Sequence, residues 1–170
     1  KEAASIKESN HHLTLLARNG VGFKNLLKLA STAFLDGFYF RPRIDKELLK
    51  THNDGLIALS SCMHGEVGSH ILKNGMEKAV ATAEEYSALF DDRRFYLELQ
   101  ENKIPEQRDL NMKLIELSKK LSLPLVATND CHYLDKEDVR AHDVLLCLQT
   151  GKDLSSPNRR RFENDQFFLK

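Results

Sequence analysis

The sequence has few cysteines and no excess of charge of either sign, and both absences narrow the class of protein. Its 170 residues contain three cysteines, Cys62, Cys131 and Cys147, an odd number at wide spacing. A disulfide framework uses an even number of closely spaced cysteines, so these three favour a reducing compartment, and we expect a cytoplasmic protein. Its 25 basic residues balance 25 acidic ones. A general electrostatic attraction to nucleic acid or membranes is therefore excluded, and any such binding must be local.

Long apolar runs and several catalytic motifs are also missing. No stretch approaches the roughly 20 apolar residues of a membrane span. The opening letters, KEAASIKESNHH, contain neither the apolar core of a signal peptide nor an initiator methionine, which suggests a chain that begins within a longer protein. The motifs GxxxxGK, GxGxxG, GxSxG and CxxC do not occur. The sequence therefore gives no signature of a phosphate-binding loop, a dinucleotide fold, a serine hydrolase or a structural zinc site.

What is present is the composition of a globular protein in which strands alternate with helices. Hydrophobic residues make up 41% and charged residues 29% of a chain long enough for one domain or a large piece of a bigger one. Short apolar runs at 12–17, 55–62, 94–100 and 123–130 predict strands, and each is followed by apolar positions at helical spacing. Because crossovers between parallel strands normally contain helices, we predict an α/β fold with a parallel sheet, open or barrelled.

The last third of the sequence predicts one more helix and a linker. The letters DKEDVRAHDVLLCLQTG predict a helix capped near Asp135 and ended by Gly151. The cluster SSPN that follows is typical of a linker, so we divide the chain into a domain at 1–151 and a linker at 152–170. Three consecutive arginines at 159–161 could contact phosphate, although three basic residues in a linker are more commonly just solvated.

Polar groups that can bind metals recur where the predicted strands end. The carboxyl ends of parallel strands meet at one edge of a sheet, and chemistry in such folds sits there. The groups at these ends are Cys62, His64, Glu66, Glu98, Asp130 and His132. The pattern predicts a shared polar edge, and metal-assisted hydrolysis is the function that the residues alone favour most.

Each of these groups also has a plainer explanation. Asp130 and His132 are two residues apart, so in extended backbone they share a face and can supply an oxygen and a nitrogen ligand, yet Asn-Asp is also ordinary turn chemistry. Cys62 can be a thiolate ligand or a small buried hydrophobic residue. His12, beside His11, is more commonly a packed or solvated histidine. Glu98 either lines a polar pocket or lies at a solvated strand end.

Three further histidines, His64, His70 and His142, fall in segments that we predict to be helical. Packing against neighbouring side chains or helix capping explains these histidines at least as well as a metal site does. We therefore include only His64, together with Glu66 and Glu98, as candidate pocket residues.

Five segments taken together carry a resemblance to a known family. They are HHLTLLARNGVGFKNLLKLAS, GLIALSSCMHGEV, FYLELQEN, LPLVATNDCHYLDKEDVRAHDVLLCLQTGK and RRRFENDQFFLK. In this order and spacing they closely resemble the PHP (polymerase and histidinol phosphatase) domain of bacterial replicative DNA polymerase III alpha subunits. The resemblance implies the C-terminal portion of a distorted (βα)7 PHP barrel running into the start of the polymerase palm. It also implies four metal ligands, which are His12, Cys62, Asp130 and His132.

The resemblance implies a function in chromosome replication. The parent would be a DNA-directed DNA polymerase that uses magnesium, binds primer-template DNA and deoxynucleotides, and assembles with a sliding clamp and a proofreading exonuclease. This segment would bind zinc, manganese or magnesium and act as a metal-dependent 3′–5′ exonuclease or phosphoesterase. The alternative is an inactive structural platform that stabilises the polymerase and docks a separate exonuclease.

The sequence departs from the family pattern in two respects. The family's first metal motif, HxH, its Asp-His pair and a glutamate should precede the histidine of HLTLLA, and they do not occur here. The polymerase carboxylates of the family lie beyond residue 170. We therefore expect about half of the metal cluster to be missing and the isolated chain to be inactive.

Overall fold

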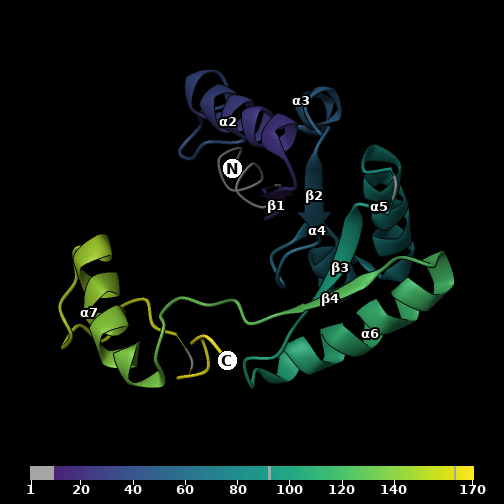
Figure 1. Ribbon diagram of the computed structural model, residues 1–170. Coiled ribbons are helices and arrows are strands. Elements are labelled where there is room, and N and C mark those ends of the chain that lie inside the picture. The colour runs from purple at the N-terminus through teal and green to yellow at the C-terminus, as the bar shows by residue number, and fades with distance from the viewer. Residues whose placement is uncertain (1–9, 92, 163) are drawn as a thin grey trace.

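The sheet at the centre of the molecule contains the strands that the sequence predicts. The structure, a computed structural model, describes residues 10–91, 93–162 and 164–170. These residues form a four-stranded sheet in the order β1-β2-β3-β4 (Figure 1). Its strands are β1 (Thr14–Ala17), β2 (Leu56–Leu59), β3 (Phe95–Gln100) and β4 (Leu125–Thr128). All four predicted strands are confirmed, and each is shorter than its apolar run.

The direction of β1 differs from the prediction. Strands β2, β3 and β4 run parallel, but β1 pairs with β2 antiparallel, with Thr14 opposite Leu59 and Ala17 opposite Leu56. The prediction of an all-parallel sheet is therefore wrong for β1. An apolar run indicates a strand but not its direction, and a helical connection permits a parallel crossover without requiring one. As a result, the start of β1 lies beside the end of β2, at the carboxyl rim of the three parallel strands.

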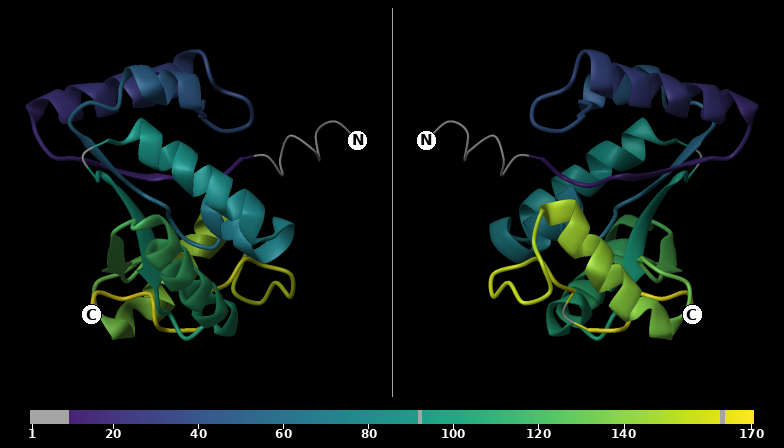
Figure 2. Two further views of the ribbon diagram at one scale, coloured as in Figure 1. Left: turned by 90° about the vertical axis from the view of Figure 1, so that its right-hand side faces the viewer. Right: turned by 90° about the vertical axis from the view of Figure 1, so that its left-hand side faces the viewer.

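Helices surround the sheet on more than one side. In Figure 2, α5 and α6 lie on one side of the molecule and α7 on the opposite side, while α2 and α3 lie together at the end away from α6. The helices and helical turns are α2 (Gly20–Leu35), α3 (Lys46–Thr51), α4 (Glu66–Ser69), the π-helical turn η1 (His70–Asn74), α5 (Met76–Leu89), α6 (Pro105–Leu121), the 3-10 turn η2 (Lys136–Asp138) and α7 (Val139–Thr150). None of the helices in the described residues is long and apolar enough to cross a membrane. The architecture is mixed α/β, as part of a PHP barrel would be.

Side-chain caps fix where α2 and the last helical segment begin. The side chain of Asn19 accepts the Gly22 N–H at 2.9 Å, and a Cβ at Gly22 would lie 1.8 Å from the Gly55 carbonyl oxygen, so α2 starts tight against the turn before β2. Asp135 forms a capping box at η2, and Gly151, with a φ of 63°, ends α7 in the left-handed conformation. The predicted helix start near Asp135 and end at Gly151 are confirmed.

The core lies between the sheet and helices α5 and α6. Phe95 and Leu97 of β3 are fully buried, and the ring of Tyr86 in α5 stacks on Phe95 at a centroid distance of 5.3 Å. Leu114 and Leu117 of α6 pack into the same cluster. Because this core is built on the parallel strands, it holds the ends of β2 and β3 in a fixed relation.

One buried arginine links the N-terminal ends of β2 and β3 by hydrogen bonds. Arg94, directly before β3, donates from its Nη1 to the carbonyl oxygen of Leu56 at 2.7 Å and to that of Asn53 at 2.8 Å. The Arg94 carbonyl accepts the Ala58 N–H at 2.9 Å. Both the backbone and the side chain of this residue therefore set the register of the two strands.

The residues after α7 return to the loop that follows β4. The His132 N–H donates to the Phe167 carbonyl at 2.8 Å, and the Leu169 N–H donates to the Leu134 carbonyl at 3.2 Å. Residues 164–170, which we call the tail, therefore lie along the loop that follows β4. That 152–170 links this domain to another one stays a prediction.

Candidate metal centre at the carboxyl rim

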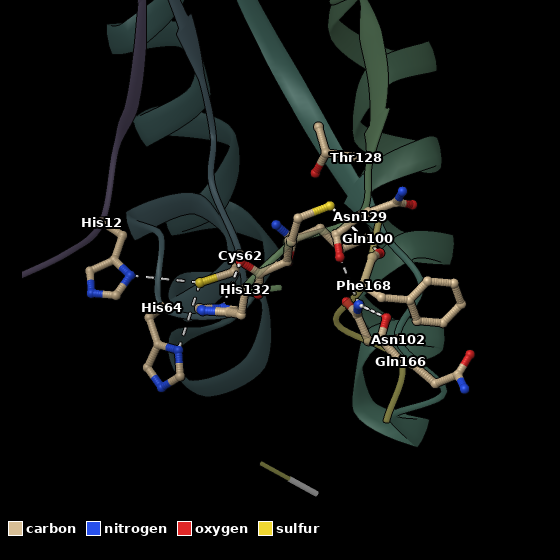
Figure 3. Close-up of polar contacts among 12 residues, drawn as sticks. His12, Cys62, His64, Gln100, Asn102, Thr128, Asn129, His132, Gln166 and Phe168 are labelled. Atoms are coloured by element: carbon tan, nitrogen blue, oxygen red, sulfur yellow. Dashed lines mark hydrogen bonds and ion pairs between the residues drawn. The ribbon is translucent and has the colours of Figure 1, made fainter. Parts of the chain in front are cut away.

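The reversed direction of β1 brings His12 to the rim. The His12 N–H donates to the His64 carbonyl at 3.1 Å, which fixes the chain before β1 against the turn after β2. The His12 Nδ1 lies 3.7 Å from the Cys62 Sγ, and the His64 Nδ1 lies 3.8 Å from the same sulfur (Figure 3). Two imidazoles from different segments therefore face one thiol.

A tight turn after β2 places Cys62 and His64 side by side. Ser61 has a φ of 66°, and the Gly65 N–H donates to the Cys62 carbonyl at 2.8 Å. A Cβ at Gly65 would lie 2.0 Å from the Ser60 carbonyl oxygen, so the turn requires glycine there. The sequence prediction placed His64 in a helical segment, but it lies in the turn before α4. The sequence signal that could have placed His64 beside Cys62 is their Cys-x-His spacing.

The surroundings of His12 favour the neutral imidazole. Burial lowers the pKa of His12, and the neighbouring His64 and Arg41 lower it further, whereas Asp130 acts in the opposite direction. A neutral imidazole has a free lone pair, which is the form that binds a metal. His12 is therefore held in the state of a ligand.

Asp130 and His132 form a second pair after β4. The His132 Nε2 lies 3.4 Å from the Asp130 Oδ1. Asp130 adopts a φ of 50°, a left-handed conformation that Asp tolerates better than most residues. The His132 ring is packed against Phe162 and Phe167, at centroid distances of 4.5 and 5.7 Å. Local spacing around residue 132 does not indicate these two aromatic partners, which come from the far end of the chain.

The two groups lie at one rim without direct contact. Cys62 follows β2 and Asp130 follows β4, which run in the same direction through β3. Within the described ranges, no hydrogen bond or ion pair joins the Cys62 group to the Asp130 pair, and no three His, Cys, Asp or Glu side chains stand where they could hold one ion. The convergence of all four predicted ligands on one site stays a prediction.

Taken two at a time, these side chains have the donor atoms and the spacing of ligands to one divalent metal ion. Tetrahedral zinc with bonds of about 2.0 to 2.3 Å places a sulfur and a nitrogen ligand roughly 3.5 Å apart. The separations of 3.7 and 3.8 Å at Cys62 are close to this spacing. The carboxylate of Asp130 beside the imidazole of His132 suits zinc, manganese or magnesium.

Glu98 is buried under the rim rather than solvated. Its side chain lies on β3 with 5% of the residue exposed, and its Oε1 accepts hydrogen bonds from Thr128 at 2.5 Å and Gln100 at 3.0 Å. The Oε2 is buried and has no hydrogen-bond partner among the residues that the structure describes, and Glu98 lines a small cavity together with Cys62. Of the two explanations of Glu98, the polar pocket therefore fits its burial, and the solvated strand end does not.

Glu66 points to a different set of partners. Its carboxylate accepts hydrogen bonds from the Tyr86 hydroxyl at 2.8 Å and the Lys46 ammonium at 3.1 Å, and it lies 4.0 Å from the His70 Nε2. Burial opposes ionisation of Glu66, but these two hydrogen bonds outweigh it and hold its pKa below the usual value. The structure brings Glu66 to a half-buried ion network and not to Cys62.

Comparison with known proteins identifies the family to which the chain belongs. Residues 2–102 match the family described as the PHP domain, so the chain belongs to the PHP domain family. It is also similar over its whole length to DNA polymerase III subunit alpha, with 48% identity over 170 residues to the protein of Thermus aquaticus. The corresponding proteins of Aquifex aeolicus and Treponema pallidum are 45% and 43% identical over 94% and 98% of the chain. The chain spans 14% of the length of each of these relatives.

Proposed function

We propose that this chain binds a divalent metal ion at the carboxyl rim of its sheet, as the PHP domain of a replicative DNA polymerase alpha subunit. The observation that carries the proposal is the position of the Cys62 Sγ, 3.7 and 3.8 Å from the imidazole nitrogens of His12 and His64. Thiolate and imidazole together favour zinc. Asp130 and His132, at the same rim, are a second pair of proposed ligands, and this pair accepts manganese or magnesium equally well.

The residues of the chain have separate tasks in this proposal. His12, kept neutral by burial, offers a lone pair, and Cys62 binds as the thiolate after losing its proton to solvent. Asp130 orients the His132 ring through its carboxylate. A bound metal lowers the pKa of a coordinated water and stabilises a leaving oxygen, which is the chemistry of phosphodiester hydrolysis. The reaction class proposed for the complete site is therefore 3′–5′ exonuclease or phosphoesterase activity.

Zinc titration of two cysteine variants tests the site. Calorimetry on the whole chain should give at least about tenfold weaker zinc binding for Cys62→Ala, because one of the ligands is lost. Cys131→Ala is the matched control, since Cys131 lies at the same rim but its Sγ donates to the Phe168 carbonyl at 3.6 Å and faces neither imidazole of the Cys62 group. Equal zinc affinity of Cys62→Ala and the wild type would contradict the proposal.

The replication role is proposed from the relatives. Identity of 48% across the whole chain supports a place in a DNA-directed DNA polymerase that works on primer-template DNA and deoxynucleotides. The proposed partners are the sliding clamp and the proofreading exonuclease of the replicase, and the proposed location is the cytoplasm. The polymerase carboxylates and their magnesium ions would belong to other parts of such a protein.

A second candidate function is an inactive platform within the polymerase, and the surface of α2 favours it. Phe23, Leu27, Phe34 and Leu35 are all exposed on this helix. Exposed apolar residues gathered on one element are typical of a surface that packs against other protein. Absence of zinc, manganese and magnesium binding in the titration would favour the platform over the metal site.

A further inference from the structure

Asn102 is a buried residue at which three separate segments of the chain meet. It is 0% exposed and follows β3. Its Nδ2 donates to the carbonyl oxygens of Asn129 at 2.8 Å and Gln166 at 3.0 Å (Figure 3). Its own carbonyl accepts the Asn164 side-chain amide at 2.7 Å. The end of β3, the loop after β4 and the tail are therefore joined through one side chain and its backbone.

The Asn102 side chain is itself held in one orientation. The Gln107 Nε2 donates to the Asn102 Oδ1 at 3.1 Å, and the Gln107 Oε1 accepts the Asn102 N–H at 2.8 Å. Every hydrogen-bonding group of Asn102 thus has a partner, and both amide hydrogens are directed at main-chain carbonyls. A residue with all its polar atoms used in a buried site has little freedom to move.

Both members of the Asp130–His132 pair depend on the segments that Asn102 joins. Asn129, whose carbonyl Asn102 holds, directly precedes Asp130 with its left-handed φ of 50°. His132 donates its N–H to the Phe167 carbonyl at 2.8 Å, and its ring packs on Phe162 and Phe167. The strained backbone at Asp130 and the ring position of His132 are therefore both fixed by contacts that end at Asn102.

The chemistry of an asparagine side chain explains why this residue type is needed. Both bonds from Nδ2 go to carbonyl oxygens, which are acceptors only. Aspartate has the same shape but would place an acceptor oxygen against those two carbonyls. Alanine would leave them without a donor. Either change removes the two hydrogen bonds by which this side chain joins the end of β3 to the loop after β4 and to the tail.

We infer that Asn102 is a positioning residue for the candidate metal centre, because it fastens the tail to the loop after β4 and so fixes Asp130 and His132. The metal part of this inference rests on the proposed function. The positional part does not, because it concerns contacts that exist without a metal. The two parts can therefore be measured separately.

The experiment compares Asn102→Asp with a matched variant, Asn111→Asp. Asn111 donates from Nδ2 to the Gln100 carbonyl at 2.8 Å, so it makes the same type of bond near the same strand but holds neither Asn129 nor the tail. Hydrogen exchange at the His132 and Leu169 amides should accelerate about tenfold or more in Asn102→Asp, as expected for two lost hydrogen bonds. The ring-proton resonances of His132 should shift as Phe162 and Phe167 move away. Exchange at the Gly65 amide, in the turn after β2, should stay the same.

The outcomes separate the inference from the proposed function. Unchanged exchange and unchanged His132 resonances in Asn102→Asp, or equal changes in Asn111→Asp, would overturn the inference. Where the wild-type chain binds zinc, Asn102→Asp should bind it about tenfold more weakly, and equal affinity would also overturn the inference. Where the wild type binds no zinc, the proposed function fails, and the two metal-free measurements still decide the role of Asn102.

A milder variant covers the case in which Asn102→Asp does not fold. Asn164→Ala removes the amide that donates to the Asn102 carbonyl at 2.7 Å and leaves the buried side chain of Asn102 intact. It also removes the Oδ1 that accepts the Gln166 N–H at 2.9 Å, a bond within the tail. The same amides should exchange faster, by a smaller factor of about threefold or more, because only one of the two lost hydrogen bonds, the one to Asn102, joins the tail to the end of β3. No change in this folded variant would overturn the inference.

Discussion

Replacing the buried Arg94 with methionine should destabilise the fold far more than the same replacement of the exposed Arg108. The Arg94 side chain is 10% exposed, and its Nη1 donates to the carbonyls of Asn53 and Leu56 at 2.8 and 2.7 Å. Methionine keeps much of the apolar stem but leaves both carbonyls without this donor. Because Leu56 is the first residue of β2 and Arg94 directly precedes β3, the loss acts on the pairing of these two strands.

The magnitude follows from the type of bond and its burial. A hydrogen bond from a charged donor contributes about 1.5 to 3 kcal/mol. The bond to Leu56 is buried and counts in full, whereas Asn53 is only half-buried and its carbonyl can be hydrated after the change. Asp91, which also pairs with Arg94, is 76% exposed and adds little. We therefore expect a loss of about 2 to 4 kcal/mol, a large part of the roughly 5 to 15 kcal/mol by which a domain is stable.

Urea unfolding followed by circular dichroism measures this loss. The matched control is Arg108→Met, because Arg108 is 69% exposed and its ion-pair partner in the described part of the chain is the exposed Glu101. The control should change the free energy of unfolding by less than about 0.5 kcal/mol. A loss of less than about 1 kcal/mol in Arg94→Met, or a loss equal to that of the control, would refute the importance of this buried donor.

Two other predictions concern pH and activity. Because the pKa of Glu66 is lowered in the folded chain, its contribution to stability is present above its unfolded pKa and disappears as the pH falls through its folded pKa. Glu66→Gln should therefore destabilise the chain at about pH 7 and have a much smaller effect at about pH 3. Urea unfolding measures both losses, with the exposed Glu116→Gln as the control. An equal loss of stability at the two pH values would contradict this prediction. The 170-residue chain alone should extend no primer in the presence of magnesium and the four deoxynucleotides, and extension above the background of a heat-inactivated sample would show that it contains polymerase carboxylates.

The apolar runs of the sequence were enough to predict the elements of the fold but not their directions. The run at 12–17 predicts a strand because its residues can be buried on one side, and β1 lies there. Its reversal depends on the pairing with β2, in which Thr14 lies opposite Leu59, a contact between residues far apart in the chain. Local periodicity contains no information on such a contact. The predicted direction of β1 is therefore wrong because it depends on a tertiary contact, whereas the predicted position of the strand depends on the local pattern and is confirmed.

The candidate site shows the same division between local and distant information. The Asp-x-His spacing of 130 and 132 is visible in the sequence, and so is the Cys-x-His spacing of 62 and 64. The pairing of His12 with Cys62 needed the reversed strand, and the packing of His132 on Phe162 and Phe167 needed the return of the chain after α7. The sequence therefore predicts which side chains can bind a metal, whereas contacts between distant parts of the chain determine which of these side chains lie close together.

The left-handed backbone at Asp130 restricts how this position can change over evolutionary time. Among residue types, glycine, asparagine and aspartate tolerate a φ near 50° with the least steric cost, and of these only aspartate is charged. A change to asparagine or glycine would therefore remove the anionic ligand that we propose at this position while leaving the chain path almost undisturbed. One such mutation can therefore remove the proposed metal ligand while the domain still folds. Regaining the ligand requires aspartate, the residue type that combines tolerance of this φ with a negative charge.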